Sequence, residues 1–179
     1  MIEIRRAEPA DATQVVELLH AVSAEPEGWL LGTEQAHGVA EERRYLRAVR
    51  RHADAAVFVA VDGQLVVGRL SLARDPHPAS PHVADLGLVV ADAYRRRGIG
   101  RRLLEEAVAW ARAAGVTKLE LHVFPWNDPA IALYEETGFR REGYRRRQYR
   151  RRGVEIDAIL MARDVTPQEG GGALPGLPA

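Results

Sequence analysis

Arginine and glycine dominate one short segment that lies between an apolar run and an amphipathic run. The segment, residues 95–100, reads Arg-Arg-Arg-Gly-Ile-Gly. The first turn of a helix offers unpaired backbone N–H groups and the positive end of the helix dipole, and both attract phosphate. Gly98 and Gly100 would let a pyrophosphate approach the backbone closely, and the arginine side chains would add cationic donors. The segment therefore predicts a phosphate-binding loop at the start of a helix.

Two other nucleotide-binding loops fit the same segment poorly. The dinucleotide fingerprint G-x-G-x-x-G is incomplete, because residues 101–103, which follow Gly98-x-Gly100, are Arg-Arg-Leu. A P-loop ends in Gly-Lys-Ser/Thr, and this ending is not found in the sequence. A plain surface cluster of arginines at a helix start stays open as the alternative.

A second pattern further along the chain narrows the identity of this loop. Residues 90–104 closely resemble the acetyl-CoA loop of the GNAT family of N-acetyltransferases, whose pattern is Q/R-x-x-G-x-G/A. Residues 127–139 resemble the second signature of that family, N-x-x-A-x-x-x-Y-x-x-x-G-F, and follow in the family's order. The resemblance covers about residues 55–163, and its last part is similar to the branch that acetylates amino acids, polyamines and other small amines.

The resemblance implies where acetyl-CoA would bind. In the family the fourth and fifth strands splay apart around the pantetheine arm, so the backbone of Leu88, Val89 and Val90 would bind that arm, and a backbone amide there would polarise the thioester carbonyl. The pyrophosphate would contact the arginine and glycine loop, whose implied cofactor-binding residues are Arg95, Arg96, Arg97, Gly98, Ile99, Gly100 and Arg101. Asn127 and Ala130 would contact the cofactor at the start of the last helix, although a helix N-cap explains Asn127 equally well.

The same resemblance assigns a general acid, and the strand pattern indicates a base. Tyr134 matches the family's general acid, which would contact the cofactor and protonate the leaving thiolate. A phenol with a pKa of about 10 can pass a proton to a thiolate whose pKa is about 8.5. Asp85 stands in an otherwise apolar strand, where a carboxylate is costly unless it is paired or used, so it is the first candidate for the base that deprotonates the amine. An ion pair with a nearby arginine is the alternative for Asp85, and His122 is the second candidate base.

Acceptor binding is expected from the loop after the first helix and from the last pair of strands. The loop carries one aromatic residue and three acids that could meet a cationic amine or simply be solvated: Trp29, Glu25, Glu27 and Glu34. Two arginine triplets, residues 145–147 and 150–152, could meet an acidic group such as a substrate carboxylate, or face water.

An α/β layer fold with a mixed sheet must position these residues. Apolar patterns predict elements in the order β-α-α-β-β-β-α-β-α-β-β, and the resemblance adds that the sheet is mostly antiparallel with splayed fourth and fifth strands. Strands are expected at residues 2–6, 57–61, 65–72, 83–90, 119–124, 139–149 and 154–162, with a tight turn at Asp62-Gly63. Helices are expected at residues 11–24, 39–52, 99–114 and 129–137.

Composition limits the alternatives. Acidic and basic residues balance at 25 each, so net charge gives no reason to expect a nucleic acid or a membrane as partner. The sequence has no cysteine, which excludes disulfides, Cys-ligated metals and a Cys nucleophile, and no metal is expected. Without a signal peptide or a membrane-length apolar run, a cytoplasmic location is expected. One domain is expected over residues 1–164, followed by a disordered Gly- and Pro-rich tail at residues 165–179.

The main hypothesis is direct transfer of the acetyl group from acetyl-CoA, as cosubstrate, to the primary amine of a small molecule in a ternary complex. The closest alternative is acetylation of a protein N-terminus or lysine on the same scaffold. An alternative of another class is a CoA-binding regulatory module without turnover. A homodimer is compatible with the resemblance, because dimers are frequent in the family.

Overall fold

A computed structural model describes residues 1–30, 38–151 and 153–166 of the chain. The strands are β1 (Ile2–Arg6), β2 (Ala55–Asp62), β3 (Leu65–Arg74), β4 (Val83–Val90), β5 (Lys118–Val123), β6 (Arg140–Arg151) and β7 (Val154–Asp164). The α-helices are α1 (Ala12–Ser23), α2 (Val39–Val49), α3 (Ile99–Ala113) and α4 (Asp128–Glu136). Two short 3-10 helices, Pro9–Asp11 and Asp92–Tyr94, precede α1 and α3.

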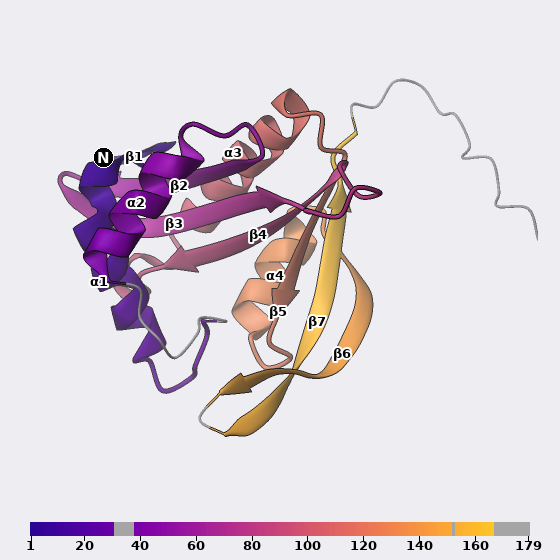
Figure 1. The fold of residues 1–179 in the computed structure, drawn as a ribbon. Coiled ribbons are helices and arrows are strands. Elements are labelled where there is room, and N and C mark those ends of the chain that lie inside the picture. Colours follow the sequence, from indigo (N-terminus) through magenta and orange to yellow (C-terminus); the bar gives the residue numbers. More distant parts are fainter. Residues whose placement is uncertain (31–37, 152, 167–179) are drawn as a thin grey trace, which may run out of the picture.

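The seven strands form one open sheet in the order β1-β2-β3-β4-β5-β7-β6 (Figure 1). All neighbouring strands are antiparallel except β4 and β5, which are parallel and are joined through α3. The pairing of β4 with β5 ends early, at Asp85 and Glu120, and the two strands diverge beyond that point (Figure 1). The mixed, mostly antiparallel sheet with splayed β4 and β5 confirms the expected architecture.

Helices cover the two faces of the sheet unequally. On one face, α3 and α4 pack in a core cluster that contains Leu103, Leu104 and Ile131 together with Leu86 and Leu121 of the sheet. On the other face, α1 and α2 pack in a second cluster over β2, β3 and β4 (Figure 1). We call the first side the α3 face and the second side the α1 face. No described helix covers β5, β7 and β6 on the α1 face, so that part of the sheet is open.

Alternation along β4 places successive side chains on opposite faces, as expected from the period of a strand. Ala84 and Leu86 belong to the core cluster on the α3 face, whereas Val89 belongs to the cluster under α1. Asp85 and Gly87, in register with Val89, therefore face the α1 side, and both are exposed there. The strand carries an acid toward the open half of the sheet.

Two expectations shift in detail. The turn between β2 and β3 consists of Gly63 and Gln64, because Asp62 still pairs with Leu65, so the predicted Asp62-Gly63 turn is wrong by one residue. Gly63 has φ +63°, which suits glycine at the first position of a tight hairpin turn.

The end of the chain also differs slightly from expectation. Val165, one residue beyond the predicted end of the domain, is buried and donates its backbone N–H to the carbonyl of Thr117. The predicted disordered tail falls mainly on residues 167–179, which lie outside the described residues. Among the described helices, none has the length and apolar character needed to cross a membrane.

Candidate active site

The β4–α3 loop has a backbone shaped for an anion. Arg96 adopts a left-handed conformation with φ +61°, and Gly98, the N-cap of α3, has φ +76°. A left-handed conformation is unfavourable for a non-glycine residue and tends to persist where it serves a function. Left-handed residues next to a helix start turn consecutive N–H groups toward one concavity, which is a common way to bind phosphate. The loop therefore has two left-handed residues at the start of α3, and phosphate binding there stays a prediction.

The three arginines of the loop are not equivalent. Arg96 and Arg97 are exposed, and the Arg97 guanidinium lies 5.0 Å from the ring centre of Tyr94. The guanidinium of Arg95 is instead engaged by the protein, with both carboxylate oxygens of Glu25 at 2.7 Å. The loop therefore presents two arginine side chains toward solvent and one toward the chain segment after α1.

Gly100 brings the two signature segments into contact. A Cβ atom at this position would lie 2.7 Å from Cδ2 of Leu133 in α4 and 3.6 Å from Cδ2 of Leu88 in β4. Only glycine therefore allows α3, α4 and β4 to approach this closely without a shift. Leu133 directly precedes Tyr134 in α4, so this contact lies next to the predicted acid along the helix.

Asn127 caps α4. Its side-chain oxygen accepts a hydrogen bond of 3.2 Å from the backbone N–H of Ala130, which confirms the N-cap interpretation. The amide nitrogen of Asn127 keeps its two donors for another partner. Contacts of Asn127 and Ala130 with a cofactor stay predictions.

Tyr134 is buried on the α3 face. Its ring packs edge-on against Phe139, with ring centres 5.7 Å apart. No described residue hydrogen-bonds to its hydroxyl, and complete burial raises the pKa of the phenol above its usual range. Tyr134 is therefore a neutral donor at physiological pH, which is the state that a general acid requires.

The last three residues of β4 border the gap between β4 and β5. Leu88, Val89 and Val90 lie beyond Asp85, where the pairing with β5 has ended, while they still pair with β3. The carbonyl of Val90 already accepts a hydrogen bond of 3.1 Å from Nε of Arg95. Binding of a pantetheine arm by the remaining backbone groups on the β5 side stays a prediction.

Five polar side chains converge on the open half of the α1 face, and we call them the acceptor-face cluster. Asp85 of β4 stands opposite Glu120 of β5, and His122 follows two residues later on the same face. Register along β7 places Arg145 and Tyr149 of β6 on this face too. Their positions depend on an irregularity in β6, which takes four steps from Arg145 to Tyr149 while β7 takes two.

His122 and Tyr149 link β5 to β6 within this cluster. The Tyr149 hydroxyl and Nδ1 of His122 share a hydrogen bond of 2.5 Å, and their rings meet edge-on. Burial, followed by the charge of Arg145, lowers the pKa of His122, so the imidazole stays neutral near pH 7. Burial raises the pKa of Tyr149, and the Asp85 carboxylate contributes to this rise.

Asp85 has the most perturbed carboxyl group of the cluster. Loss of hydration against the sheet, reinforced by the neighbouring Glu120 carboxylate, raises the pKa of Asp85 to about 6. The residue is nonetheless exposed to solvent on the open side of the sheet. A carboxylate with this pKa is mostly ionised at pH 7 and basic enough to take a proton, which suits a general base. Asp85 has no ion pair with an arginine among the described residues.

The acceptor-face cluster includes two residues that sequence reasoning did not single out, Glu120 and Tyr149. Glu120 had a usable signal, because it alternates with Leu119 and Leu121 and so must share a face with His122. Tyr149 had none, because its face depends on the irregularity in β6. Of the predicted loop residues, Glu25 lies against Arg95, Trp29 packs beside the α1 cluster, and Glu34 lies outside the described residues.

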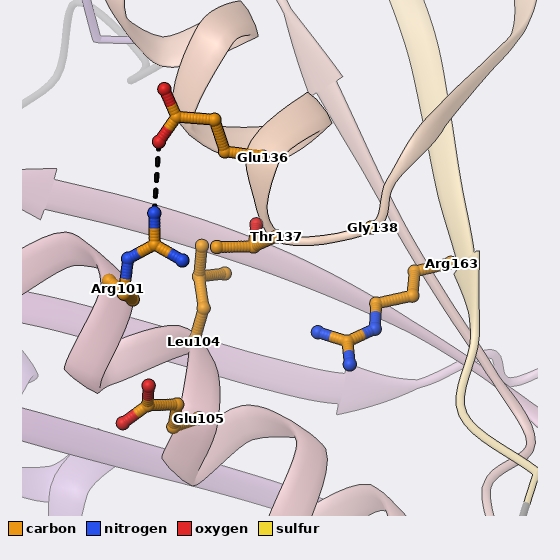
Figure 2. Close-up of a pocket in the computed structure, with 7 residues that line it drawn as sticks. All are labelled: Arg101, Leu104, Glu105, Glu136, Thr137, Gly138 and Arg163. Carbon is orange, nitrogen blue, oxygen red and sulfur yellow. Dashed lines mark hydrogen bonds and ion pairs between the residues drawn. The ribbon is translucent and has the colours of Figure 1, made fainter.

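An open cleft on the α3 face lies between α3 and the end of α4. It is lined by Arg101, Leu104, Glu105, Glu136, Thr137, Gly138 and Arg163 (Figure 2). Arg101 and Glu136 form an ion pair of 2.9 Å across the cleft, so α3 and the end of α4 are joined there (Figure 2). The cleft contains no residue of the acceptor-face cluster.

Comparison with known proteins identifies relatives along most of the chain. The profile of the acetyltransferase (GNAT) family matches residues 18–139. The chain is 32% identical over 166 residues to the L-amino acid N-acetyltransferase AaaT of Escherichia coli (strain K12), which covers 90% of this chain and 97% of that protein. It is 48% identical over 93 residues to the N-alpha-acetyltransferase RimI of Mycobacterium tuberculosis, with 52% of this chain and 54% of that protein covered.

Solved structures agree with these sequence matches. A GNAT-family acetyltransferase from Streptococcus pneumoniae superposes with a TM-score of 0.80 at 29% identity, covering 92% of this chain and 99% of that chain. An acetyltransferase structure from Salmonella typhimurium, determined with its cofactor acetyl-CoA, superposes with a TM-score of 0.83 at 20% identity, covering 97% and 99%. The second likeness supports the fold alone.

Proposed function

The chain belongs to the GNAT family and is an acetyl-CoA-dependent N-acetyltransferase, and we propose that its acceptor is the primary amine of a small molecule. An amino acid is the first candidate for this acceptor. The observation that carries the proposal is the acceptor-face cluster. It places a carboxylate of raised pKa, Asp85, where β4 and β5 separate, on the face opposite Tyr134. A base and an acid on opposite sides of one gap are what a direct acyl transfer needs.

The two substrates would bind on opposite faces of the sheet. Acetyl-CoA would enter the gap from the α3 face, where the β4–α3 loop, Asn127 and Tyr134 lie, while the acceptor would approach over the open α1 face. The residues of the loop fit the cofactor, because left-handed Arg96 and Gly98 turn backbone N–H groups outward at the start of α3. When bound, acetyl-CoA supplies the activated acetyl group.

The chain's own groups would then manage two protons. An amine arrives mostly as ammonium, so Asp85 would accept a proton from it, directly or through water, before the nitrogen attacks the acetyl carbon. Backbone N–H groups of β4 would stabilise the negative charge that develops on the carbonyl oxygen. As the C–N bond forms and the C–S bond breaks, the hydroxyl of Tyr134 would protonate the departing thiolate. The nitrogen would release its second proton as the amide forms, and this proton would restore the Tyr134 hydroxyl through water.

Arg145 favours an acceptor that carries a carboxylate. It lies close enough to Asp85, His122 and Tyr149 to influence the pKa of each, yet it forms no ion pair within the described residues. A guanidinium beside a base suits a zwitterion, with the ammonium toward Asp85 and the carboxylate toward Arg145. The similarity to an L-amino acid N-acetyltransferase over nearly the whole chain supports the same choice.

A protein N-terminus is the second candidate acceptor. The similarity to RimI, an N-alpha-acetyltransferase, favours it, although the match covers about half of each chain. An N-terminal residue also offers an amine, but its carboxyl group is a peptide bond and would leave Arg145 without an anionic partner.

Release of free thiol from acetyl-CoA tests the proposal. The purified protein is assayed against L-amino acids, the matching amino-acid amides, polyamines, aminoglycosides and peptides. We expect turnover on one or more L-amino acids and a loss of at least about tenfold in kcat/KM for the amide, because the charge-assisted bond to Arg145 is lost. Turnover on peptides alone would establish the second candidate, and binding of acetyl-CoA without turnover on any acceptor would indicate a non-catalytic module.

A further inference from the structure

The chain segment that leaves α1, residues 23–28, is fastened by three side chains from three other parts of the molecule. Arg95 of the β4–α3 loop binds its Glu25, Trp126 of the β5–α4 loop binds a backbone carbonyl, and Arg151 of β6 binds another. Arg151 lies two residues from Tyr149 along β6, so it shares the face of the acceptor-face cluster. The 23–28 segment is thus tied to the β4–α3 loop, to the β5–α4 loop and to β6.

The bond between Arg95 and Glu25 is the strongest of the three. The guanidinium lies 2.7 Å from both carboxylate oxygens, and the two side chains are only 29% and 17% exposed. Charge-assisted bonds of this kind are about twice as strong as neutral ones, and they weaken little with salt when they are sheltered. Removal of Arg95 leaves the partly buried Glu25 carboxylate without its guanidinium partner, whereas removal of Glu25 leaves Arg95 paired with Asp92 alone.

The other hydrogen bonds of Arg95 also engage its guanidinium within the protein. Its Nε donates to the carbonyl of Val90 at 3.1 Å, and one terminal nitrogen donates to Asp92 at 3.1 Å. Together with the contacts to Glu25, these bonds use four of the five N–H donors that a guanidinium has. The side chain therefore joins the end of β4, the loop and the 23–28 segment, and has little capacity left for a phosphate.

The other two side chains, those of Trp126 and Arg151, donate hydrogen bonds to the backbone of the 23–28 segment. Nε1 of Trp126, whose ring stacks on Phe124, donates to the carbonyl of Glu27 at 3.1 Å. Arg151 donates to the carbonyl of Ser23 at 3.0 Å, and its guanidinium lies against Gly28, where a Cβ atom would collide with it. Both bonds hold the segment near the acceptor side, but neither involves the cofactor loop.

We propose that Arg95 and Glu25 form a positioning pair for the acceptor, through which the cofactor loop holds the 23–28 segment beside the acceptor-face cluster. The sequence pattern assigns Arg95 to phosphate binding, whereas its contacts assign it to the acceptor side. Phosphate binding then falls to the backbone of the loop and to the exposed Arg96 and Arg97. The expected effect of the pair on acceptor kinetics rests on the proposed function. Its expected effect on the 23–28 segment does not.

Four variants separate the two roles of the loop arginines. Arg95→Gln and Glu25→Gln break the pair, the double variant removes it, and Arg96→Gln removes a candidate phosphate ligand. Isothermal titration with acetyl-CoA gives the dissociation constant of each variant. We expect a change of less than about threefold for Arg95→Gln and Glu25→Gln and a rise of about tenfold for Arg96→Gln. A tenfold rise for Arg95→Gln with none for Glu25→Gln would show that Arg95 binds phosphate and would overturn the pair.

Hydrogen exchange measures the segment without any acceptor. Amides of residues 23–28 should exchange at least about tenfold faster in Arg95→Gln and in Glu25→Gln, and no faster still in the double variant, because one bond is lost in each case. The exposed residues Glu17 on α1 and Arg47 on α2 provide matched controls as Glu17→Gln and Arg47→Gln. Unchanged exchange in both single variants would contradict the proposal, whatever the acceptor is.

Kinetics with the best acceptor of the thiol-release panel complete the test. We expect the acceptor KM to rise about tenfold in each single variant and in the double variant, with kcat changed less than about threefold. Arg95→Lys keeps the charge but cannot bind Val90 and Asp92 at the same time as Glu25, so it should recover only part of the KM. Additive effects of the two single variants on KM would overturn the pair. If no acceptor in the panel is turned over, the proposed function fails, and the titration and exchange results still decide the pair.

Discussion

Asp85 and Tyr134 lie on opposite faces of one sheet, and burial raises the pKa of both groups. The same physical cause serves opposite tasks. For Asp85 the shift turns a weak base into one that can take a proton from an ammonium near neutral pH. The Tyr134 phenol is already protonated near pH 7 at its usual pKa of about 10, and burial keeps it in that form, so that it can donate a proton to the leaving thiolate.

The pKa of Asp85 predicts the pH dependence of the acceptor reaction. Asp85 must be ionised to act as the base, and its pKa is about 6, so activity should fall as pH drops through that value. We expect kcat/KM for the acceptor to decrease about tenfold for each pH unit well below 6. The Asp85→Asn variant should lose about 100-fold or more in rate at pH 7.5, and its pH–activity profile should lack the acidic limb, that is, the fall in activity as pH drops through 6. The limb is measured by thiol release between pH 5 and 8.

Glu17→Gln is the control for this profile, because Glu17 is exposed on α1 and distant in sequence from the acceptor-face cluster. Its limb near pH 6 should match that of the unmodified protein. A limb that survives in Asp85→Asn and disappears in a His122→Gln variant would transfer the role of base to His122.

Tyr134 allows an equally direct prediction. The Tyr134→Phe variant removes a hydroxyl that has no hydrogen-bond partner among the described residues, so the fold should lose little stability. We expect kcat to fall about 100-fold or more, because general acid catalysis is lost, while the dissociation constant for acetyl-CoA changes less than about threefold. Thermal unfolding, titration and thiol release measure the three quantities. An unchanged kcat would remove Tyr134 from the mechanism.

Residue identity was easier to predict than residue partnership. Tyr134, Asn127 and the loop glycines lie where the two signature segments place them, because local spacing along a helix decides their positions. The same spacing predicted nothing about Glu25 and Arg95, which are 70 residues apart in the chain. Contacts of this kind depend on how elements pack, and a short pattern carries no information about them.

At the scale of elements, the start of α3 shows why two neighbouring glycines need not do the same work. Gly98 has φ +76° and open space around it, so glycine is needed there for the backbone conformation. Gly100 lies at the contact of α3 with α4, where a Cβ atom would meet Leu133, so glycine is needed there because it has no side chain. Their common appearance in the signature conceals two different physical reasons.

These reasons predict different defects. Gly98→Ala forces alanine into a left-handed conformation at a cost of about 1–2 kcal/mol, and relief of that strain would distort the loop, so acetyl-CoA should bind at least about tenfold more weakly. Gly100→Ala should displace Leu133 and, with it, the neighbouring Tyr134, so that kcat falls more than cofactor affinity. Titration with acetyl-CoA and thiol release distinguish the two outcomes. Equal loss of affinity in both variants would contradict the separate roles.

The irregularity in β6 marks the limit of prediction for elements. The patterns of β6 and β7 indicate two strands, and the structure confirms both. The extra residues between Arg145 and Tyr149, which include Arg147 with φ +51°, follow no periodic pattern. They are held by Asp157, which accepts hydrogen bonds from the Arg147 backbone and the Tyr144 hydroxyl. Such tertiary bonds decide which side chains face the acceptor, and they cannot be read from the order of residues in β6.

At the scale of the whole molecule, the sheet separates two binding faces. The apolar residues of β2, β3 and β4 alternate between two helix layers, which hold this half of the sheet rigid from both sides. Beyond Asp85 the pairing of β4 with β5 stops, and the α1 face stays open over β5, β7 and β6. The coverage of β2, β3 and β4 on both faces was predictable from near-continuous apolar runs, because buried strands between two layers are apolar on both faces. The early end of the β4–β5 pairing was expected only from the family resemblance.

Separate faces predict that both substrates are bound at once. Acetyl-CoA on the α3 face and an acceptor on the α1 face need not displace each other, and the chain has no cysteine that could carry the acetyl group between them. Initial rates at several fixed acceptor concentrations should therefore give intersecting double-reciprocal lines, the pattern of a ternary complex. Parallel lines would indicate a ping-pong reaction. Labelled CoA, incubated with acetyl-CoA and protein without acceptor, provides the decisive check: a covalent acetyl-protein would exchange label into acetyl-CoA, whereas direct transfer across the gap between β4 and β5 leaves the label in free CoA.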